Sequence, residues 1–235
     1  MLSRATLLAE AGDGPAARAL IRQAIERLEA AGGGELLPLA HAKLAGEELY
    51  AGRAGEARDW ALRAAAGGSA MGRTYLGWAR LELGDAGGVE DIRQALAASL
   101  ERGQVHDAAP TLSVLADWVF LIDGPAAGIA AYEETASFCE QHGMRLHARH
   151  ARAEALRMRL ELGHPARVAR DADELIAWAG GARAGYVGLV ARIWRQAARA
   201  MAGLPPAEEP DEVLAGAWEV GEPQLVVPAL TGAAR

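Results

Sequence analysis

Four side chains of metal-binding type lie within twelve residues, at Cys139, His142, His147 and His150. Cysteine and histidine are ligands that zinc prefers. The members of each pair are three residues apart on one helical face, and Gly143 separates the pairs, so both could reach one ion. A structural role is the favoured interpretation, because cysteine packs as a small hydrophobe and histidines near helix ends bond free carbonyls. We expect no metal and no other cofactor.

A second group of residues is basic. Arg145, Arg149 and Arg152 are spaced by four and three residues, so they share one face of a helix. A row of guanidinium groups could bind an anion or an acidic peptide through charge-assisted hydrogen bonds. The alternative is a solvated face, in which these arginines and Arg157 and Arg159 of the same helix pair with the nearby Glu154 and Glu161.

The best-defined catalytic motifs do not fit this sequence. A phosphate-binding loop needs a lysine directly after its glycines, and the single lysine, Lys43, lies in the middle of an expected helix. The glycine-rich tracts at 32–34 and 67–68 follow no strand, which indicates helix connectors. Ser69 lacks the glycine two residues later that a nucleophile elbow requires. We therefore expect that the chain is not an enzyme.

Composition favours helices. About half of the 235 residues are hydrophobic and about a quarter are alanine, which is the strongest helix former. Aromatic residues, which strands favour, make up only 5%. These values predict one helical globular or repeat domain with an ample core.

Charge and cysteine usage limit the function classes. The net charge of -7 disfavours direct nucleic-acid binding, which needs basic surface for phosphate contacts. A single cysteine rules out an internal disulfide framework. The N-terminus shows no secretion signal, and no apolar run approaches the ~20 residues of a membrane span. We expect a cytoplasmic protein without membrane contact.

Helical periodicity and breaker residues divide the chain into short helices. Glycine ends a helix in the left-handed conformation, and proline is tolerated in the first turn, as at Pro15, Pro125 and Pro165. The expected helices span residues 2–11, 15–31, 35–51, 55–66, 70–83, 88–102, 105–122, 125–142, 144–162, 165–179, 183–202 and 211–220, with another from about 223.

Related turns recur along the chain. Their anchors at residues 12, 52, 84, 123 and 163 are spaced by 40, 32, 39 and 40, a range typical of helix-pair repeats. Seven residues before each anchor stand Ala5, Ala45, Gly77, Ala116 and Leu156, mostly small. Small residues also recur five and twelve residues after most anchors, at Ala17, Ala24, Ala57, Ala64 and Gly128, with Val89, Leu96, Thr135, Val168 and Leu175 at the other positions. Small residues at fixed offsets let antiparallel helices approach closely.

This pattern resembles the tetratricopeptide repeat over roughly residues 1 to 180, best at Leu76-Gly77 and Gly84-Asp85. The fifth repeat departs from it, with Ala155-Leu156 where leucine and a small residue are expected. The resemblance implies an all-α fold, an α-solenoid of antiparallel helix pairs in a right-handed superhelix. It predicts repeats over 1–202, about five pairs plus a sixth first helix. A proline-rich break at 203–210 and a partial terminal repeat at 211–235 would follow.

In the tetratricopeptide family, the first helix of each pair lines a concave groove. Two usual contact positions lie one and four residues after the small residue. The resemblance therefore implies the pairs Gly46 and Leu49, Trp78 and Leu81, Asp117 and Phe120, and Arg157 and Leu160. The candidates with aromatic or charged side chains for recognition are Trp78, Asp117, Phe120 and Arg157.

The sequence is also similar to the helical-repeat region of large bacterial regulators, which carry a signal-transduction ATPase or a nucleotide cyclase and often a LuxR-type DNA-binding end. This likeness implies a non-enzymatic scaffold, the regulatory arm of a signalling or transcriptional regulator. Its partner would be a protein, a peptide or an adjacent domain, and the oligomeric state is not indicated. The alternative is a sensor that holds a metabolite in the groove.

Overall fold

The computed structural model describes residues 1–11, 13–180 and 185–233, and all regular elements in this part of the chain are α-helices. The prediction of an all-α fold is confirmed. The helices are α1 (Leu2–Glu10), α2 (Gly14–Ala30), α3 (Leu36–Tyr50), α4 (Ala54–Ala66), α5 (Ala70–Glu82), α6 (Gly88–Glu101), α7 (Val105–Asp123), α8 (Pro125–Gln141), α9 (Arg145–Glu161), α10 (Pro165–Trp178), α11 (Tyr186–Met201), α12 (Pro210–Val220) and α13 (Pro223–Ala233).

The turn residues end and begin these helices as expected. Gly84 and Gly163 adopt φ angles of 87° and 78°, which a side chain would disfavour. Pro15, Pro125 and Pro165 each stand in the first turn of their helix. The anchor at residue 12 and the expected start of the eleventh helix at 183 lie outside the described residues. The remaining predicted bounds agree with the structure to within one residue.

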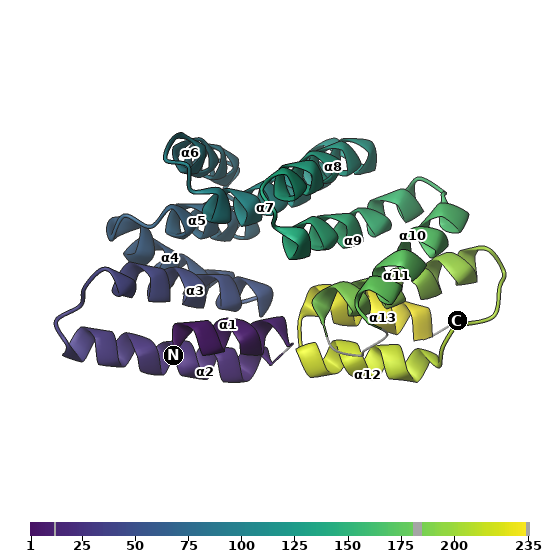
Figure 1. Cartoon of the computed structure of the whole chain (residues 1–235), viewed down its shortest axis with the longest axis horizontal. Helices are drawn as coiled ribbons and strands as arrows, with labels where there is room; N and C mark the ends of the chain where they lie inside the picture. The colour runs from purple at the N-terminus through teal and green to yellow at the C-terminus, as the bar shows by residue number, and fades with distance from the viewer. Residues whose placement is uncertain (12, 181–184, 234–235) are drawn as a thin grey trace. The chain divides into compact units, whose positions relative to one another are not determined.

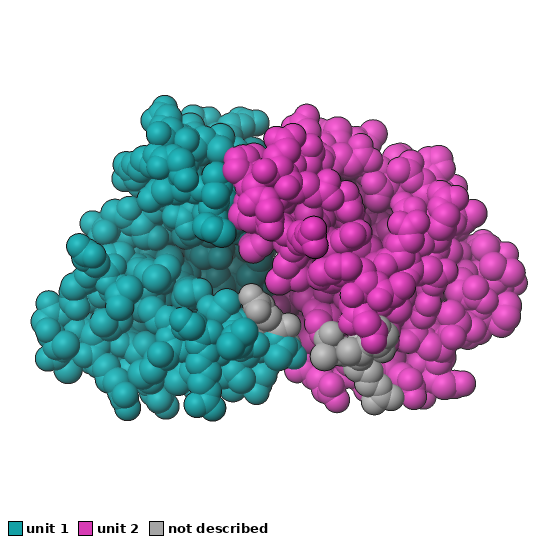
Figure 2. Space-filling model, in the orientation of Figure 1, with its two compact units in different colours: residues 1–115 teal, residues 116–235 magenta. Residues whose placement is uncertain are grey.

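The chain forms two compact units, Met1–Leu115 and Ala116–Arg235 (Figure 2). The boundary between them falls within α7. Most consecutive helices within each unit pack against each other, such as the antiparallel pairs α3 with α4 and α8 with α9 (Figure 1). The first helices of successive pairs also touch, α3 with α5 and α9 with α11. Packing of neighbour on neighbour, pair after pair, is the arrangement of an α-solenoid.

Close approach of the helices rests on the small residues. Ala5, Ala45, Gly77 and Ala116 are all buried. In the third pair, a Cβ on Gly88 would collide with the backbone oxygen of Gly77, so two backbones touch there.

The third pair differs from the spacing rule by one residue. Gly88 and Ala95 are buried where the rule pointed to Val89 and Leu96, which are half-buried. α6 begins four residues after Gly84, whereas the other second helices begin two residues after their anchors. The longer turn changes which residues face α5.

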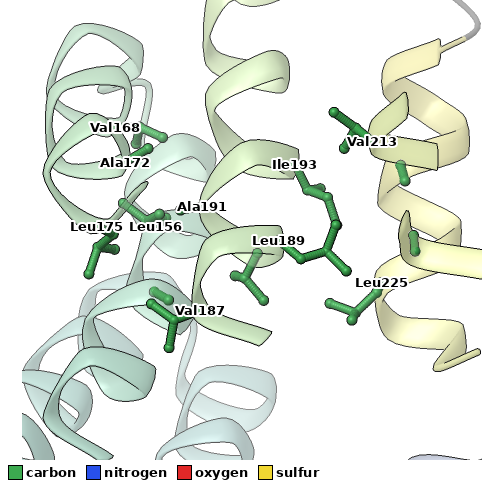
Figure 3. Packing of buried hydrophobic residues seen from close by; sticks show 14 of the residues in the cluster. Leu156, Val168, Ala172, Leu175, Val187, Leu189, Ala191, Ile193, Val213 and Leu225 are labelled. Carbon is green, nitrogen blue, oxygen red and sulfur yellow. The ribbon is translucent and has the colours of Figure 1, made fainter. Parts of the chain in front are cut away.

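Apolar side chains from five helices, α9 to α13, fill the core of unit 2 (Figure 3). Leu156, the large residue in a small-residue position, is fully buried against Val168 and Leu175. The same core takes in Leu225 from the last helix. In the fifth repeat the leucine, Leu156, therefore packs with residues of α10. The alanine before it, Ala155, packs with residues of α8.

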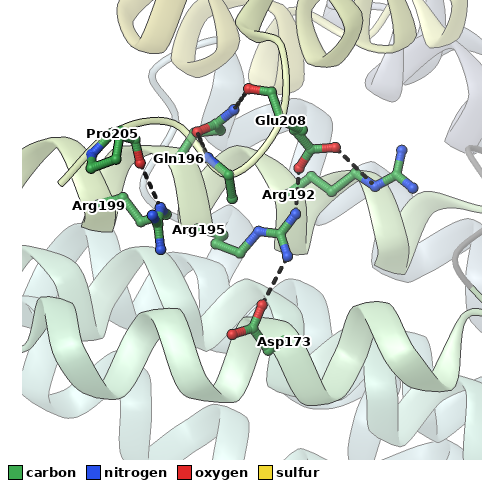
Figure 4. A network of polar contacts seen from close by, with 8 residues as sticks. Asp173, Arg192, Arg195, Gln196, Arg199, Pro205 and Glu208 are labelled. Carbon is green, nitrogen blue, oxygen red and sulfur yellow. Dashed lines mark hydrogen bonds and ion pairs between the residues drawn. The ribbon is translucent and has the colours of Figure 1, made fainter.

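The proline-rich segment after α11 is held by polar contacts rather than by a core (Figure 4). Gln196 donates from its amide to the Glu208 carbonyl at 2.7 Å, and Arg199 donates to the Pro205 carbonyl at 2.7 Å. Arg195 binds Glu208 at 2.6 Å and Asp173 of α10 at 2.8 Å. The segment is thus tied to α11 along its length. The division of the chain at 203–210 stays a prediction.

Among the described helices, α7 alone has the length and mean hydropathy of a membrane span. A core helix of a soluble protein passes the same test, and α7 supplies the buried residues Ala108, Val114 and Phe120. Asp107 and Asp117 also interrupt its apolar surface. This one helix is weak evidence for membrane insertion.

Candidate functional site

Trp78 lies in unit 1, on the face that α5 forms with α3. Its ring meets Tyr50 of α3 edge-on, with centroids 5.3 Å apart, and the Tyr75 centroid is 6.4 Å away. The indole N–H donates to Glu82 at 3.0 Å. Gly46 leaves the space that Tyr75 occupies, because a Cβ there would lie 2.9 Å from the Tyr75 ring. Three half-buried aromatic rings therefore gather on what we call the unit 1 face: Tyr50, Tyr75 and Trp78.

A carboxyl group lies on the same side of α3. Burial raises the pKa of Glu47 to about 7, and the nearby Arg18 and Lys43 moderate the rise. Burial also raises the pKa of the Tyr75 hydroxyl, and the carboxylates of Glu47 and Asp107 add to the effect. Glu47 therefore titrates near neutral pH, and the charge beside the aromatic rings changes with it.

The other three predicted groove residues lie in unit 2. The Arg157 guanidinium stacks over the Phe120 ring at 4.8 Å from its centroid, which joins α9 to α7. Asp117 accepts a hydrogen bond from the Tyr132 hydroxyl at 2.5 Å. Arg157 also donates to Glu161 at 3.0 Å. The structure therefore brings Phe120 and Arg157 into contact.

Nearer the start of α9, Glu154 and His150 contact Tyr186 of α11. The Tyr186 hydroxyl donates to Glu154 at 2.9 Å, and its ring stacks on His150 at 5.1 Å between centroids. Burial raises the pKa of Glu154 to about 8, and the carboxylate of Asp117 contributes to the rise. Burial lowers the pKa of His150 to about 4, with a further contribution from His147. At neutral pH these groups are mostly an uncharged carboxyl and an uncharged imidazole. With Asp117, Phe120 and Arg157 they form the unit 2 face.

The cysteine and histidines considered for zinc are not brought to one point in the described part of the chain. No group of three or more potential ligands was found there. Cys139 is buried, which raises the pKa of its thiol. The His142 ring lies 2.8 Å from the Phe138 carbonyl, and His147 and His150 stack at 6.4 Å. These are the structural roles open to such residues near helix ends.

The three arginines of the predicted basic face separate. Arg145 is exposed, Arg149 lies over the ring of Trp178 at 5.6 Å, and Arg152 pairs with Glu140 of α8 at 2.5 Å. Of the ion pairs that the alternative expected, Arg157 with Glu161 forms at 3.0 Å, whereas Glu154 accepts from Tyr186. The spacing of residues along α9 could not predict these partners, because they lie on the neighbouring helices α8 and α10.

A pocket of about 330 Å³ opens between α8, α9 and α10, on the side of α9 that carries Arg149 and Arg152. Its other charged walls are Arg159, Glu133, Glu140, Asp171 and Glu174. Arg159 is buried and binds Glu133 at 3.0 Å. Sequence reasoning missed this pocket, although Ala155 at a leucine position of the repeat was a visible signal.

Comparison with known proteins gives structural likeness only. No protein-family model and no curated protein sequence matches the chain. It is similar to the C-terminal part of a TPR repeat-containing protein from Cytophaga hutchinsonii, with 11% identity and a TM-score of 0.39 over 99% of this chain and 94% of that one. It is also similar to a tetratricopeptide repeat protein from Parabacteroides merdae, with 10% identity and a TM-score of 0.38 over 100% and 97%. The fold assignment rests on the helix-pair packing itself.

Proposed function

We propose that this chain is a non-enzymatic protein-interaction scaffold whose partner docks on the first helices of its pairs. One observation carries the proposal. In each unit a predicted contact residue meets an aromatic ring on a neighbouring first helix, Trp78 with Tyr50 and Arg157 with Phe120. Tryptophan, tyrosine and arginine dominate binding energy at protein interfaces.

The mechanism is recognition by preformed surfaces. The side chains of each face are held by contacts within the unit, such as Trp78 with Glu82 and Glu154 with Tyr186. A partner that docks on such a face meets groups that are already ordered, so less conformational entropy is lost on binding. An extended or helical peptide suits these faces, because repeat scaffolds recognise such segments with adjacent first helices.

The finer assignment follows the resemblance in repeat pattern. We propose that the chain serves as the regulatory arm of a bacterial signalling or transcriptional regulator in the cytoplasm. Its partner would then be another protein or an adjacent domain of the same regulator. Neither direct nucleic-acid binding nor membrane contact belongs to this proposal.

Selection from a random peptide library tests the scaffold. Enriched peptides would be synthesised, and their Kd measured by fluorescence anisotropy against wild type, Trp78→Ala and Arg157→Ala. For each peptide, we expect one of the two variants to raise the Kd at least tenfold, which corresponds to about 1.4 kcal/mol of binding free energy.

Two exposed residues on second helices serve as matched controls, Trp218→Ala on α12 and Arg93→Ala on α6. The Kd of each control should stay within twofold of the wild-type value, and circular dichroism checks that every variant is folded. Failure to enrich any peptide, or unchanged binding by both test variants, would show that the proposal is wrong.

The alternative of a small-ligand sensor is favoured by one feature, the pocket in unit 2. Neither Asp117 nor Arg157 lines it. A metabolite bound there would therefore occupy a place different from the predicted groove, and the two functions are separable by mutation.

A further inference from the structure

The pocket between α8, α9 and α10 lies where a large apolar contact is found in the first repeats. Leu44, eight residues before its turn anchor, is fully buried and packs with Ile25 of α2. The same offsets in the later repeat give Ala155 on α9 and Ala136 on α8. Both alanines line the pocket. Two alanines thus occupy the positions at which the earlier contact has a leucine and an isoleucine.

Both alanines are buried in an apolar cluster with Tyr132 and Met158, which fill part of the lost volume. Protein interiors are close-packed, and a site that loses methylene groups either collapses or keeps an open space. Here a space of about 330 Å³ remains, with an alanine floor and charged walls. A space of that size lies at the lower end for small-molecule sites.

Arg159 supplies an unused donor at the pocket. Its side chain is only 9% exposed, and its terminal nitrogens lie 3.0 Å from Glu133 and 3.7 Å from Asp171. Its buried Nε–H has no hydrogen-bond partner among the described residues. Buried donors are nearly always satisfied, so an unpaired Arg159 Nε–H beside the pocket is unusual.

Two further charges of opposite sign remain unpaired in the walls. Arg149 of α9 makes no ion pair with any described residue and stacks on Trp178. Glu174 of α10 makes no ion pair or hydrogen bond within the described ranges, and it is exposed at the pocket. A guanidinium and a carboxylate on different walls can each bind the opposite charge of one ligand.

We infer that this pocket binds a small zwitterion, a free α-amino acid. Its carboxylate would pair with Arg149, and its ammonium group would pair with Glu174. A simple anion would face four carboxylates in the walls, and a simple cation would face three guanidinium groups. A ligand with both charges satisfies the two unpaired wall groups.

Differential scanning fluorimetry of the full chain with each common amino acid at 10 mM tests this inference, followed by calorimetry on the best ligand. Acetate and ethylamine, each carrying one of the two charges, are the comparison probes. We expect at least one amino acid to raise Tm by about 2 °C or more and both single-charge probes to leave it unchanged. No shift with any amino acid, or an equal shift with acetate or ethylamine, overturns the inference.

Variants locate the site. Ala155→Leu, which restores the residue of other repeats, should abolish binding by filling the pocket. Arg149→Met and Glu174→Gln change partly or fully exposed groups and should each weaken binding at least tenfold, with Arg73→Met and Glu219→Gln as exposed controls. Unchanged affinity in Arg149→Met and Glu174→Gln overturns the inference even if Ala155→Leu fails to fold. Binding that survives Trp78→Ala and Arg157→Ala separates this site from peptide docking.

Discussion

The contact between α2 and α3 and the contact between α8 and α9 use the same repeat positions with opposite charge. In unit 1, Arg22 of α2 binds Glu48 of α3 at 2.6 Å. In unit 2, Glu133 of α8 binds Arg159 of α9 at 3.0 Å. The α2 and α8 members lie ten residues after one anchor, and the α3 and α9 members lie four residues before the next.

Burial follows position rather than charge. The side chains on the first helices, Glu48 and Arg159, are 0% and 9% exposed, whereas Arg22 and Glu133 are 46% and 58% exposed. The repeat therefore fixes which side chains meet and which of them is buried. The repeat does not determine which partner is acidic and which is basic, because a buried charge of either sign is satisfied by an opposite charge.

The apolar contact beside this pair differs in volume. The α2–α3 contact is filled by Ile25 and Leu44, and the α8–α9 contact has Ala136 and Ala155. Both contacts belong to buried apolar clusters, and the second also borders the pocket. Two contacts at the same repeat positions thus differ in the apolar volume of their side chains, and we propose that the smaller side chains leave room for a ligand.

The largest effect is expected from reversing the buried charge in unit 1. Glu48→Arg places a cation beside Arg22 and Arg53, which both bind Glu48, and should cost about 3–5 kcal/mol. Adding Arg22→Glu reproduces the polarity of the α8–α9 contact and should recover at least about 1 kcal/mol of the loss. Recovery should be incomplete because Arg53 loses Glu48 as a partner and lies beside the new arginine. Hydrogen exchange of the α2 and α3 amides measures the loss of stability in the single variant and its recovery in the double variant. No recovery in the double variant would show that the two contacts are not equivalent.

The next largest effect is expected from opening the same contact. Leu44→Ala removes a fully buried side chain from the α2–α3 contact and should cost about 2–4 kcal/mol. Urea unfolding followed by circular dichroism measures the loss. Leu62→Ala on the exposed side of α4 is the control and should change stability by less than about 0.5 kcal/mol.

Filling the corresponding space in unit 2 should act in the opposite direction. Ala155→Leu places apolar volume in the pocket and should raise stability by about 1 kcal/mol, or about 2–4 °C in Tm. A decrease of that size in the unliganded protein would mean that the pocket cannot hold a leucine, and that the comparison with Leu44 fails.

The features that sequence could predict are local. Glycine and proline turns fixed the helix bounds, and small residues at set offsets marked the buried positions, because each depends on a few neighbouring residues. The contacts that sequence missed join one helix to another. Arg152 reaches Glu140 across a turn, and Tyr186 reaches Glu154 across 32 residues. Such pairs depend on the rotation of one helix against another, which the spacing within one helix does not contain.

The smallest effect is expected from the two carboxyl groups with raised pKa. Because the folded pKa of Glu154, about 8, lies above the unfolded value near 4.5, the folded state holds more protons between these pH values. Stability from this group is complete below about pH 4.5 and is lost as pH rises toward 8. Glu47, at about 7, behaves likewise over a narrower window, since two cations moderate its shift.

Glu154→Gln should therefore flatten the decline of Tm between pH 5 and 8, and Glu47→Gln should flatten it between pH 5 and 7. Both groups are partly exposed, so each gain should be at most about 1 kcal/mol at the upper end of its window. Tm measured in steps from pH 5 to 9, with the exposed Glu219→Gln as a control, decides the matter. Parallel curves for wild type and Glu154→Gln would mean that Glu154 is ionised at neutral pH, and that the unit 2 face carries more negative charge than its burial implies.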